Sequence, residues 1–469
     1  MVQTLSGAPA KSIETDVVNA FVESLAGDVL RPGEAEYENA RRVFNGMIDR
    51  KPWLIAQPVD ADDVARCVKF AREHDVLVSV NAGGHSVQGY GVCDDGLMID
   101  LSKLKSIEVD AEGRRALAGA GVKWGELDAA TQEHGLAVTG GRISGTGVAG
   151  LTLGSGSGWL ERKIGYTVDN LLGAEVVTAN GDVLRASESE NADLFWGLRG
   201  GGGNFGVVTQ FEFRLHPVGP IVYGGLLGFP RDPAVLKAYR DFMETAPDDV
   251  CGSAALITAP PEEFVPEPVR GTPVMGIVVL YAGDPEKGPE AFKPILDLNP
   301  VLNMTGPMPY TALQQLLDAA NPPGLRNYWK ADFYPELPDE AIDKLIAGAA
   351  NVPSPMTAVL VMPNTGAVHR VPEDATALAW RKAKWSLHLL SLWEDPADDE
   401  RNIEWTRNLS ETLRPWAQEA AYLNFLMDEG EQRVKDSFGE NYRRMVELKN
   451  KYDPTNFFRL NQNIAPSSE

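Results

Sequence analysis

The sequence predicts a mixed α+β fold with more than one domain. A chain of 469 residues is long enough to form several hydrophobic cores. Residues 53–56 and 76–80 are typical of short strands, and the amphipathic helix expected over 62–74 completes a strand–helix–strand unit. Residues 207–215 alternate between apolar and polar side chains, as a strand does. Proline and glycine become frequent beyond that strand, so we expect a domain boundary near residue 220.

Composition and charge argue against several classes of protein. The formal net charge of −23 disfavours nucleic acid and anionic membranes as partners. The sequence has no apolar run of about 18 residues, so we expect no transmembrane helix. Residues 1–15 lack a basic segment followed by an apolar one, which argues against a secretory signal. The three cysteines are too widely spaced for a disulfide framework, and we therefore predict a cytoplasmic protein.

A glycine turn at residues 81–91 follows the predicted strand 76–80. Adjacent Gly83 and Gly84 leave the backbone N–H groups accessible, which suits a pyrophosphate. His85 lies inside the turn, so a bound cofactor would contact its imidazole. The alternative is a surface turn that contains an incidental histidine.

A second glycine-rich segment covers residues 139–158. A flexible linker is one interpretation, but linkers are polar, whereas Ile143, Val148 and Leu151 lie within this segment. We therefore expect a backbone packed closely against a flat ligand.

A third glycine cluster, residues 200–206, formally matches the nicotinamide fingerprint GxGxxG. That fingerprint must follow a strand and open a helix. Here a short helix over 193–198 precedes the glycines and the strand 207–215 follows them, so we reject the nicotinamide interpretation. Upstream, Asn180-Gly181 between apolar runs predicts a β-hairpin over 175–184. We further expect helices over 401–416 and 431–449.

Hydrolase and metal signatures are absent from the sequence. Neither Ser155 nor Ser157 sits in a GxSxG elbow, and there is no CxxC and no histidine pair with metal-ligand spacing. The sequence therefore predicts no metal site.

Several blocks of the sequence resemble one family in the same order along the chain. They are Asn81–Gly91, Gly140–Gly158, Asp169–Leu172, Asp193–Val208 and the terminal Asn461–Ile464. Together they resemble the berberine-bridge-enzyme-like branch of the flavin oxidases that share the vanillyl-alcohol-oxidase fold. The resemblance covers essentially the whole chain.

This resemblance implies a fold, a domain division and a cofactor. Residues 1–220 would form a PCMH-type FAD-binding domain of two α/β subdomains. Residues 221–420 would form a substrate domain with an antiparallel sheet backed by helices. Residues 421–469 would return to the FAD domain.

The resemblance also implies which residues hold FAD. His85 stands where the family bonds the flavin covalently, and Gly83, Gly84 and Ser86 would hold the pyrophosphate. The full implied set of cofactor-binding residues is Ala82, Gly83, Gly84, His85, Ser86, Gly141, Thr146, Gly147, Gly150, Val208, Asn461 and Asn463.

Three departures from the family pattern matter. Ile143 stands where many relatives have a second flavin-bonding cysteine, so we expect one covalent bond, through His85. Thr146 replaces a usually apolar residue near the flavin, which leaves oxygen reactivity open. Phe425 replaces the tyrosine that relatives often use as catalytic base.

His388 is our candidate for the replacement base. In the strand expected over 384–393, Ser386 and His388 point away from the apolar face, which suggests a wet cavity. A histidine near its reference pKa is suited to accept a substrate proton at neutral pH. The alternative is a hydrogen-bonded core histidine. Tyr422 is a second catalytic candidate, for orienting the substrate.

The predicted activity is an FAD-dependent oxidoreductase acting on a small molecule. A carbon that bears a hydroxyl or amine would lose hydride to flavin N5, and we expect O2 as acceptor, giving H2O2. The alternatives are a dehydrogenase with another acceptor and a non-catalytic flavin-binding protein. Sugars, aromatic alcohols and amines all stay open as substrates, and the sequence gives no indication of the oligomeric state.

Overall fold

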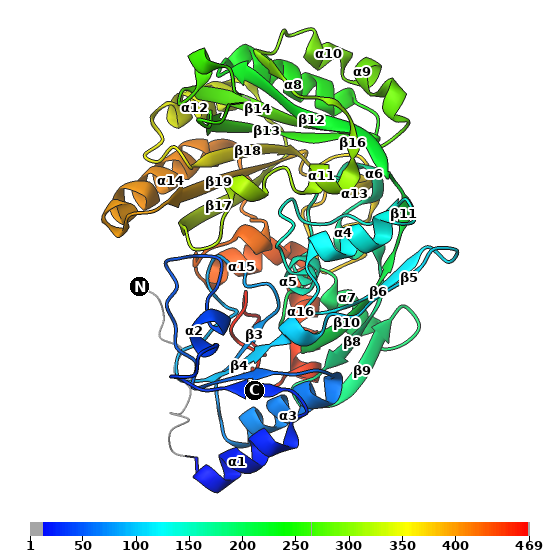
Figure 1. Cartoon of the computed structure of the whole chain (residues 1–469), viewed down its shortest axis with the longest axis vertical. Coiled ribbons are helices and arrows are strands. Elements are labelled where there is room, and N and C mark those ends of the chain that lie inside the picture. The colour runs from blue at the N-terminus through cyan, green and yellow to red at the C-terminus, as the bar shows by residue number, and fades with distance from the viewer. Residues whose placement is uncertain (1–12, 264, 468–469) are drawn as a thin grey trace.

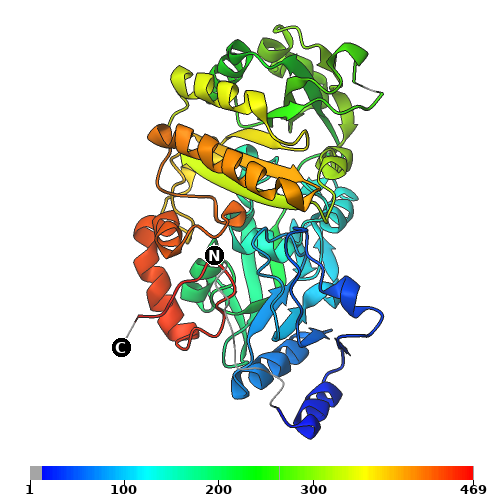
Figure 2. The ribbon, with the colours of Figure 1, turned by 90° about the vertical axis from the view of Figure 1, so that its left-hand side faces the viewer.

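A computed structural model describes residues 13–263 and 265–467, and its three main β-sheets form two halves (Figure 1). In this view the largest sheet and its helices lie in the upper half, and the two smaller sheets lie in the lower half. The C-terminal segment runs along the lower half, as Figure 2 shows from the side.

The first sheet has the strand order β1-β2-β4-β3. β2 (Leu54–Gln57) and β3 (Val78–Asn81) both run parallel to β4 (Leu97–Asp100), while β1 (Asp28–Leu30) is antiparallel to β2. α3 (Ala61–Glu73) makes the crossover between β2 and β3, which confirms the predicted strand–helix–strand unit. α1 (Thr15–Ser24) packs on α3 through stacked Phe21 and Phe70 rings, whose centroids lie 4.0 Å apart.

The second sheet is antiparallel, in the order β5-β6-β10-β8-β9. Its strands are β5 (Ile107–Asp110), β6 (Arg115–Gly119), β8 (Leu171–Val177), β9 (Val183–Ser187) and β10 (Val207–Arg214). β8 and β9 form the predicted hairpin, and Gly181 in its turn has φ +74°. α7 (Ala192–Leu198) precedes the glycine cluster and β10 follows it, as the sequence predicts.

The third sheet is antiparallel, in the order β15-β12-β14-β13-β18-β19-β17, with β16 also paired to β12. Its long strands are β12 (Ile221–Pro230), β13 (Val250–Thr258), β14 (Pro273–Tyr281), β17 (Arg326–Tyr334), β18 (Ala358–Pro363) and β19 (Trp385–Trp393), and its short ones are β15 (Leu302–Asn303) and β16 (Gly306–Pro309). The apolar side chains of Trp385, Leu387 and Leu389 belong to the core under the covering helices. Those helices are α8 (Pro233–Thr245), α12 (Asp339–Gly348) and α14 (Asp399–Leu413), and α14 lies along the sheet in Figure 2. The opposite face of the sheet is directed toward the lower half (Figure 1).

Shorter elements join these layers. They are α2 (Tyr37–Ala40), α4 (Trp124–Gln132), β7 (Leu136–Ala137), α5 (Val148–Leu153), α6 (Glu161–Ile164), β11 (His216–Pro217), α9 (Gly288–Ala291), α10 (Lys293–Leu296), α11 (Tyr310–Gln314) and α13 (Ala367–Arg370).

The C-terminal segment contains α15 (Glu431–Phe438) and α16 (Tyr442–Tyr452). The single helix predicted over 431–449 is therefore wrong. Gly439 has φ +49°, a left-handed conformation that ends α15. Phe438, Met445 and Leu448 nevertheless belong to the same hydrophobic core as the first two sheets, so the end of the chain is built into the lower half.

Candidate active site

A cavity of about 1370 Å³ lies between the third sheet and the lower half. Its lining comes from the glycine turn after β3, the glycine-rich segment that includes α5, the loop before β10, the third sheet and the C-terminal tail. Pockets for one drug-sized ligand occupy roughly 300–1,000 Å³, so this cavity has room for a large ligand and a second, smaller one.

The two glycine segments touch back to back at the edge of this cavity. A Cβ atom added to Gly83 would lie 2.3 Å from the backbone N of Gly147, and one added to Gly147 would lie 2.7 Å from the N of Gly83. Neither position has space for a side chain. The close contact explains why both segments need glycine and holds the two loops at a fixed distance.

Other glycines leave open space inside the cavity. A Cβ atom at Gly150 or Gly203 would meet no atom within 4 Å, although both residues line the cavity. Larger side chains at these positions would fill the space that a flat ligand needs. The glycine-rich segment 139–158 is thus ordered backbone beside a ligand-sized space, as the sequence predicts, and not a free linker.

The C-terminal tail is fastened to the glycine loop 200–206. Asn204 donates to the carbonyl of Gln462 at 3.0 Å and accepts from the amide of Ile464 at 3.0 Å. Lys449 Nζ donates to the carbonyls of Asn204 and Phe458, both at 2.9 Å, and pairs with Asp453 at 2.6 Å. Lys449 and Asp453 are both fully buried. These contacts bring the tail to the cavity.

The two tail asparagines differ in their relation to the cavity. Asn461 lines it and donates to the carbonyl of Gly203 at 3.0 Å. Its Oδ1 atom is buried and has no hydrogen-bond partner within the described part of the chain. Asn463 is not among the lining residues, and its Oδ1 atom also lacks a partner there.

His85 lies on the cavity wall of the lower half. Its ring stacks on Phe44, with ring centroids 4.5 Å apart. Burial lowers the pKa of His85 to about 4, with a smaller contribution from the charge of Lys123. The imidazole is therefore neutral at pH 7, the state in which a ring nitrogen has a free lone pair.

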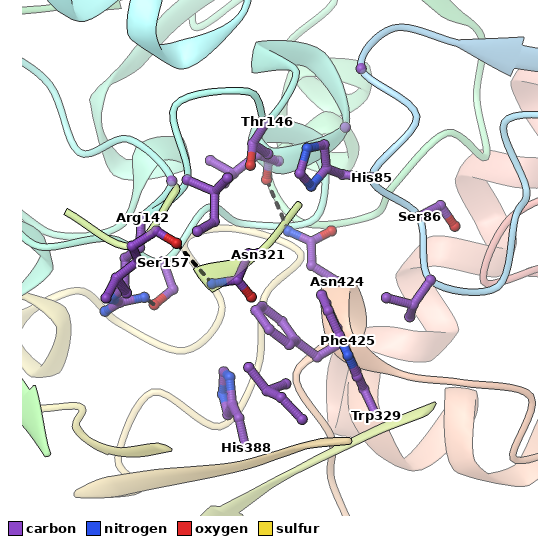
Figure 3. A pocket seen from close by; sticks show the side chains of 18 of the residues that line it. His85, Ser86, Arg142, Thr146, Ser157, Asn321, Trp329, His388, Asn424 and Phe425 are labelled. Carbon is purple, nitrogen blue, oxygen red and sulfur yellow. Dashed lines mark hydrogen bonds between the residues drawn. The ribbon is translucent and has the colours of Figure 1, made fainter. Parts of the chain in front are cut away.

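Aromatic rings continue from His85 to the third sheet. Phe44 lies edge-on to Trp329 at 6.0 Å, and Trp329 stacks on Phe425 at 5.1 Å. Phe425 in turn packs against His388 at 4.3 Å. Figure 3 shows His85 and Thr146 on one side of the pocket and His388 on the other, with Phe425 between them.

His388 lies on β19 and lines the cavity, yet only 1% of its surface is exposed because Phe425 and Tyr422 cover it. Its Nε2 atom lies 2.7 Å from Ser386 Oγ, and no described residue pairs with its buried Nδ1. Burial, assisted by the charge of Arg142, lowers the pKa of His388 well below 6.5. This differs from the near-reference pKa that we expected from the sequence, which does not show how closely the ring is covered.

Tyr422 also lines the cavity. Its hydroxyl oxygen accepts a hydrogen bond from the amide of Ser157 at 2.7 Å. Burial raises the pKa of Tyr422 above its ordinary value, while the hydrogen bonds to its oxygen act in the opposite direction. Tyr422 is therefore a neutral phenol at pH 7.

Arg142 is a site residue that the sequence interpretation missed. Its guanidinium donates to Ser157 Oγ at 2.9 Å, pairs with Glu161 at 3.1 Å and lies 5.0 Å from the centroid of the Trp159 ring. Both Arg142 and Ser157 line the cavity. Arg142 is the single charged residue within the glycine-rich segment 139–158, and this isolated charge is the sequence signal by which it could have been found.

The cavity has the features that FAD binding requires. The paired glycine loops, the open space over Gly150 and Gly203, and the free acceptor of Asn461 fit a flat dinucleotide with a phosphate bridge. Of the twelve residues that we expect to hold the cofactor, all but Asn463 line the cavity. No group of three or more metal-ligating side chains occurs within residues 13–263 and 265–467.

The fold and the site define a flavin-dependent oxidoreductase. A family model described as "FAD binding domain" matches residues 52–187, and one described as "Berberine and berberine like" matches residues 421–465. An FAD-linked oxidoreductase of Dictyostelium discoideum is 31% identical over 460 residues, which cover 96% of this chain and 97% of that protein. The chain therefore belongs to the berberine-bridge-enzyme-like family of FAD-linked oxidoreductases.

Further relatives agree with this assignment. (R)-6-hydroxynicotine oxidase of Paenarthrobacter nicotinovorans is 40% identical over 193 residues, which cover 41% of this chain and 42% of that enzyme. The crystal structure of 6-hydroxy-D-nicotine oxidase from Arthrobacter nicotinovorans superimposes with a TM-score of 0.84 at 26% identity, covering 95% of this chain and 99% of that one. The BBE-like 1 protein of Physcomitrella patens, at 23% identity, shares the fold, with a TM-score of 0.86 and coverage of 96% and 100%.

The helices give no sign of a membrane span. Within residues 13–263 and 265–467, none is long and apolar enough to cross a bilayer.

Proposed function

We propose that this FAD-dependent oxidoreductase is an oxidase of a small molecule that carries a hydroxyl or amine on the reacting carbon. The observation that carries the proposal is one cavity lined by His85 and the glycine loops on one side and by His388 on the other. Bound FAD would supply the hydride acceptor, and the protein would supply position and proton transfer.

We further propose a single covalent bond between FAD and His85. The neutral imidazole and its place on the cavity wall support this bond. Ile143 lines the same cavity and has no thiol to offer, so a second bond is not expected. Gly83, Gly84 and Ser86 would hold the pyrophosphate, and Asn461 would approach the cofactor from the tail.

His388 is the proposed general base. Its neutral ring has one nitrogen near Ser386 and one without a partner among the described residues, and the latter is available to accept the proton of the substrate hydroxyl or ammonium. Phe425 covers the ring, so the Phe425 side chain must turn aside when substrate binds. Tyr422, held by the Ser157 amide, would orient the substrate.

Dioxygen is the proposed electron acceptor. Two electrons and two protons would convert O2 to H2O2 and return the flavin to its oxidised state. Similar proteins include one named (R)-6-hydroxynicotine oxidase and, at the level of the fold, one named chitooligosaccharide oxidase. The alternative is a dehydrogenase that uses another acceptor. Thr146 at the cavity wall supports this alternative, because it replaces a usually apolar residue near the flavin.

Anaerobic mixing followed by oxygen tests the proposal. A primary alcohol or amine from a broad panel should bleach the flavin without oxygen, and adding air should restore the colour with one H2O2 per turnover. No bleaching by any member would support a non-catalytic flavoprotein. Bleaching without rapid recovery in air would support a dehydrogenase.

We also propose a division into domains and a cellular location. The domain division at residues 220 and 420 is supported by the separation of the third sheet from the first two along the chain. A cytoplasmic location is supported by the cysteines Cys67, Cys93 and Cys251, which are all free and buried.

A further inference from the structure

The cavity extends well beyond His388 along the third sheet. Gly276 pairs with Ala255, Ala255 pairs with Leu360, and Leu360 pairs with His388, so these four residues form one row across β14, β13, β18 and β19. All four line the cavity. Neighbouring strands are about 4.8 Å apart, so the row spans roughly 14 Å.

The side chains of the row become smaller with distance from His388. Ala255 and Gly276 are small, and a Cβ atom added to Gly276 would find its nearest neighbours at 3.4 and 3.6 Å. At Gly276 the row is therefore a shallow groove, bordered by the Leu226 and Ile257 side chains of the neighbouring strands. The rows on either side are mainly apolar, with Leu226, Val278 and Ile257 among their members.

Several of the polar groups that line the cavity lie at its inner end. His388, Tyr422, Ser157 and Arg142 all lie there, where Phe425 meets the third sheet. Along the row itself, Leu360, Ala255 and Gly276 offer no side-chain donor or acceptor. A sugar chain on this row would lose the hydrogen bonds that its hydroxyls make to water, which is costly without replacements.

Two exposed methionines lie at the rim of the cavity. Met304 and Met356 line the cavity and are 47% and 39% exposed. The loop at Pro260–Glu262 also lines the cavity, and Pro261 and Glu262 are exposed, so the cavity reaches the surface here. Exposed methionines at the rim, together with an apolar row, are suited to admit and hold an apolar molecule.

From this arrangement we infer that the substrate is an elongated, largely apolar molecule with its oxidisable carbon at one end. The reacting end lies beside His388, and the apolar body extends over Leu360, Ala255 and Gly276 toward Met304, which lies beside β12 beyond β14. Ala255 and Gly276 thus determine the accepted substrate length. Only one part of this inference rests on the proposed function, namely which end of the substrate reacts.

Binding of a non-oxidisable series tests this inference separately from catalysis. Straight-chain primary amides from propanamide to decanamide carry a polar head but no carbon bearing a hydroxyl or amine. Binding to the holoenzyme is measured by the shift of the flavin absorption bands. We expect Kd to fall about fourfold per methylene, the equivalent of about 0.8 kcal/mol, until the chain reaches Gly276.

Substitutions in the row provide the controls. Ala255→Leu should leave the Kd of propanamide unchanged and raise the Kd of decanamide at least tenfold. Gly276→Ala is tolerated, because the added Cβ atom would lie at least 3.4 Å from its neighbours. This variant should raise the Kd of the longest amides only. Ala234→Leu, an exposed position of α8 behind the sheet, should change neither.

Several results would overturn the inference. They are a Kd that does not depend on chain length, an unchanged decanamide Kd in both row variants, and tighter binding of glucose or cellobiose than of decanamide. Failure of the proposed function has a different signature, because the amide series would keep its length dependence while no alcohol or amine bleaches the flavin.

Discussion

His388 Nε2 lies 2.7 Å from Ser386 Oγ on the same face of β19, while no described residue pairs with Nδ1. The hydrogen bond fixes the ring plane, and the pKa lowered by burial keeps the ring neutral. A neutral, oriented ring with one unpaired nitrogen supports the proposed role of His388 as general base.

Removing this imidazole should slow the reductive half-reaction. We expect His388→Ala to reduce the anaerobic rate of flavin bleaching by about 10²–10⁴-fold, the usual contribution of a general base. His134→Ala, at an exposed position outside the cavity lining, is the control and should keep the wild-type rate. An unchanged rate in His388→Ala would remove this residue from the mechanism.

The rate of flavin reduction should fall in acid solution and stay constant at neutral and higher pH. Because the pKa of His388 lies well below 6.5, the base is already deprotonated at pH 6.5 and above. The rate should therefore be constant from about pH 6.5 upward and fall only in more acid solution. A stopped-flow profile that rises through pH 7 would place the proton acceptor elsewhere.

Acid should also destabilise the fold through the buried histidines. The pKa of His85 is about 4, and an unfolded histidine titrates near 6.5. Below about pH 6.5 the unfolded state binds more protons than the folded state, so the unfolding free energy declines as pH falls toward 4. Thermal unfolding of the apoprotein between pH 4 and pH 8 measures this, and in His85→Ala the decline should be smaller.

Phe425 should control access to His388. Its ring packs at 4.3 Å from the imidazole, so Phe425→Ala should uncover the base and lower KM for bulky substrates. Phe425→Tyr adds a phenol at the position of the family's usual base. We expect this variant to restore part of the rate lost in His388→Ala, measured in the double variant by anaerobic bleaching.

His85→Ala should abolish the covalent flavin. Intact-protein mass spectrometry of the wild type should show one flavin-sized increment, and peptide mapping should locate it on the peptide that contains His85. In the variant, acid precipitation should leave the flavin in the supernatant, whereas Ile143→Ala should keep it with the protein. Flavin that stays bound in His85→Ala would contradict the proposed bond.

Two glycine substitutions should have opposite effects on stability. Gly83→Ala places a methyl group 2.3 Å from backbone at Gly147, and overpacking of this kind costs about 1–3 kcal/mol. Gly150→Ala meets no neighbour within 4 Å and lies in α5, so it should stabilise the apoprotein slightly while lowering its FAD content. Thermal unfolding and the flavin-to-protein ratio separate the two effects.

Much of the lower half could be predicted from residues that are close in sequence. The strand–helix–strand unit, the hairpin at Gly181 and the inverted order around residues 200–206 follow from local periodicity and turn chemistry. The helix predicted over 431–449 failed because a local apolar pattern continues across Gly439, while the backbone there is left-handed. The role of Arg142 was also missed, because its partners Ser157 and Glu161 acquire meaning only when the segment folds back on itself.

The sequence alone determined the family, the cofactor and the candidate positions His85 and His388, because glycine loops and strand alternation can be recognised from residues that are neighbours in the sequence. Only the tertiary structure decided that Phe425 covers His388, that the pKa of His388 is low, and that Ala255 and Gly276 extend the cavity along the sheet. Burial and cross-strand register depend on contacts between segments far apart in the chain, and a single sequence does not encode those contacts locally.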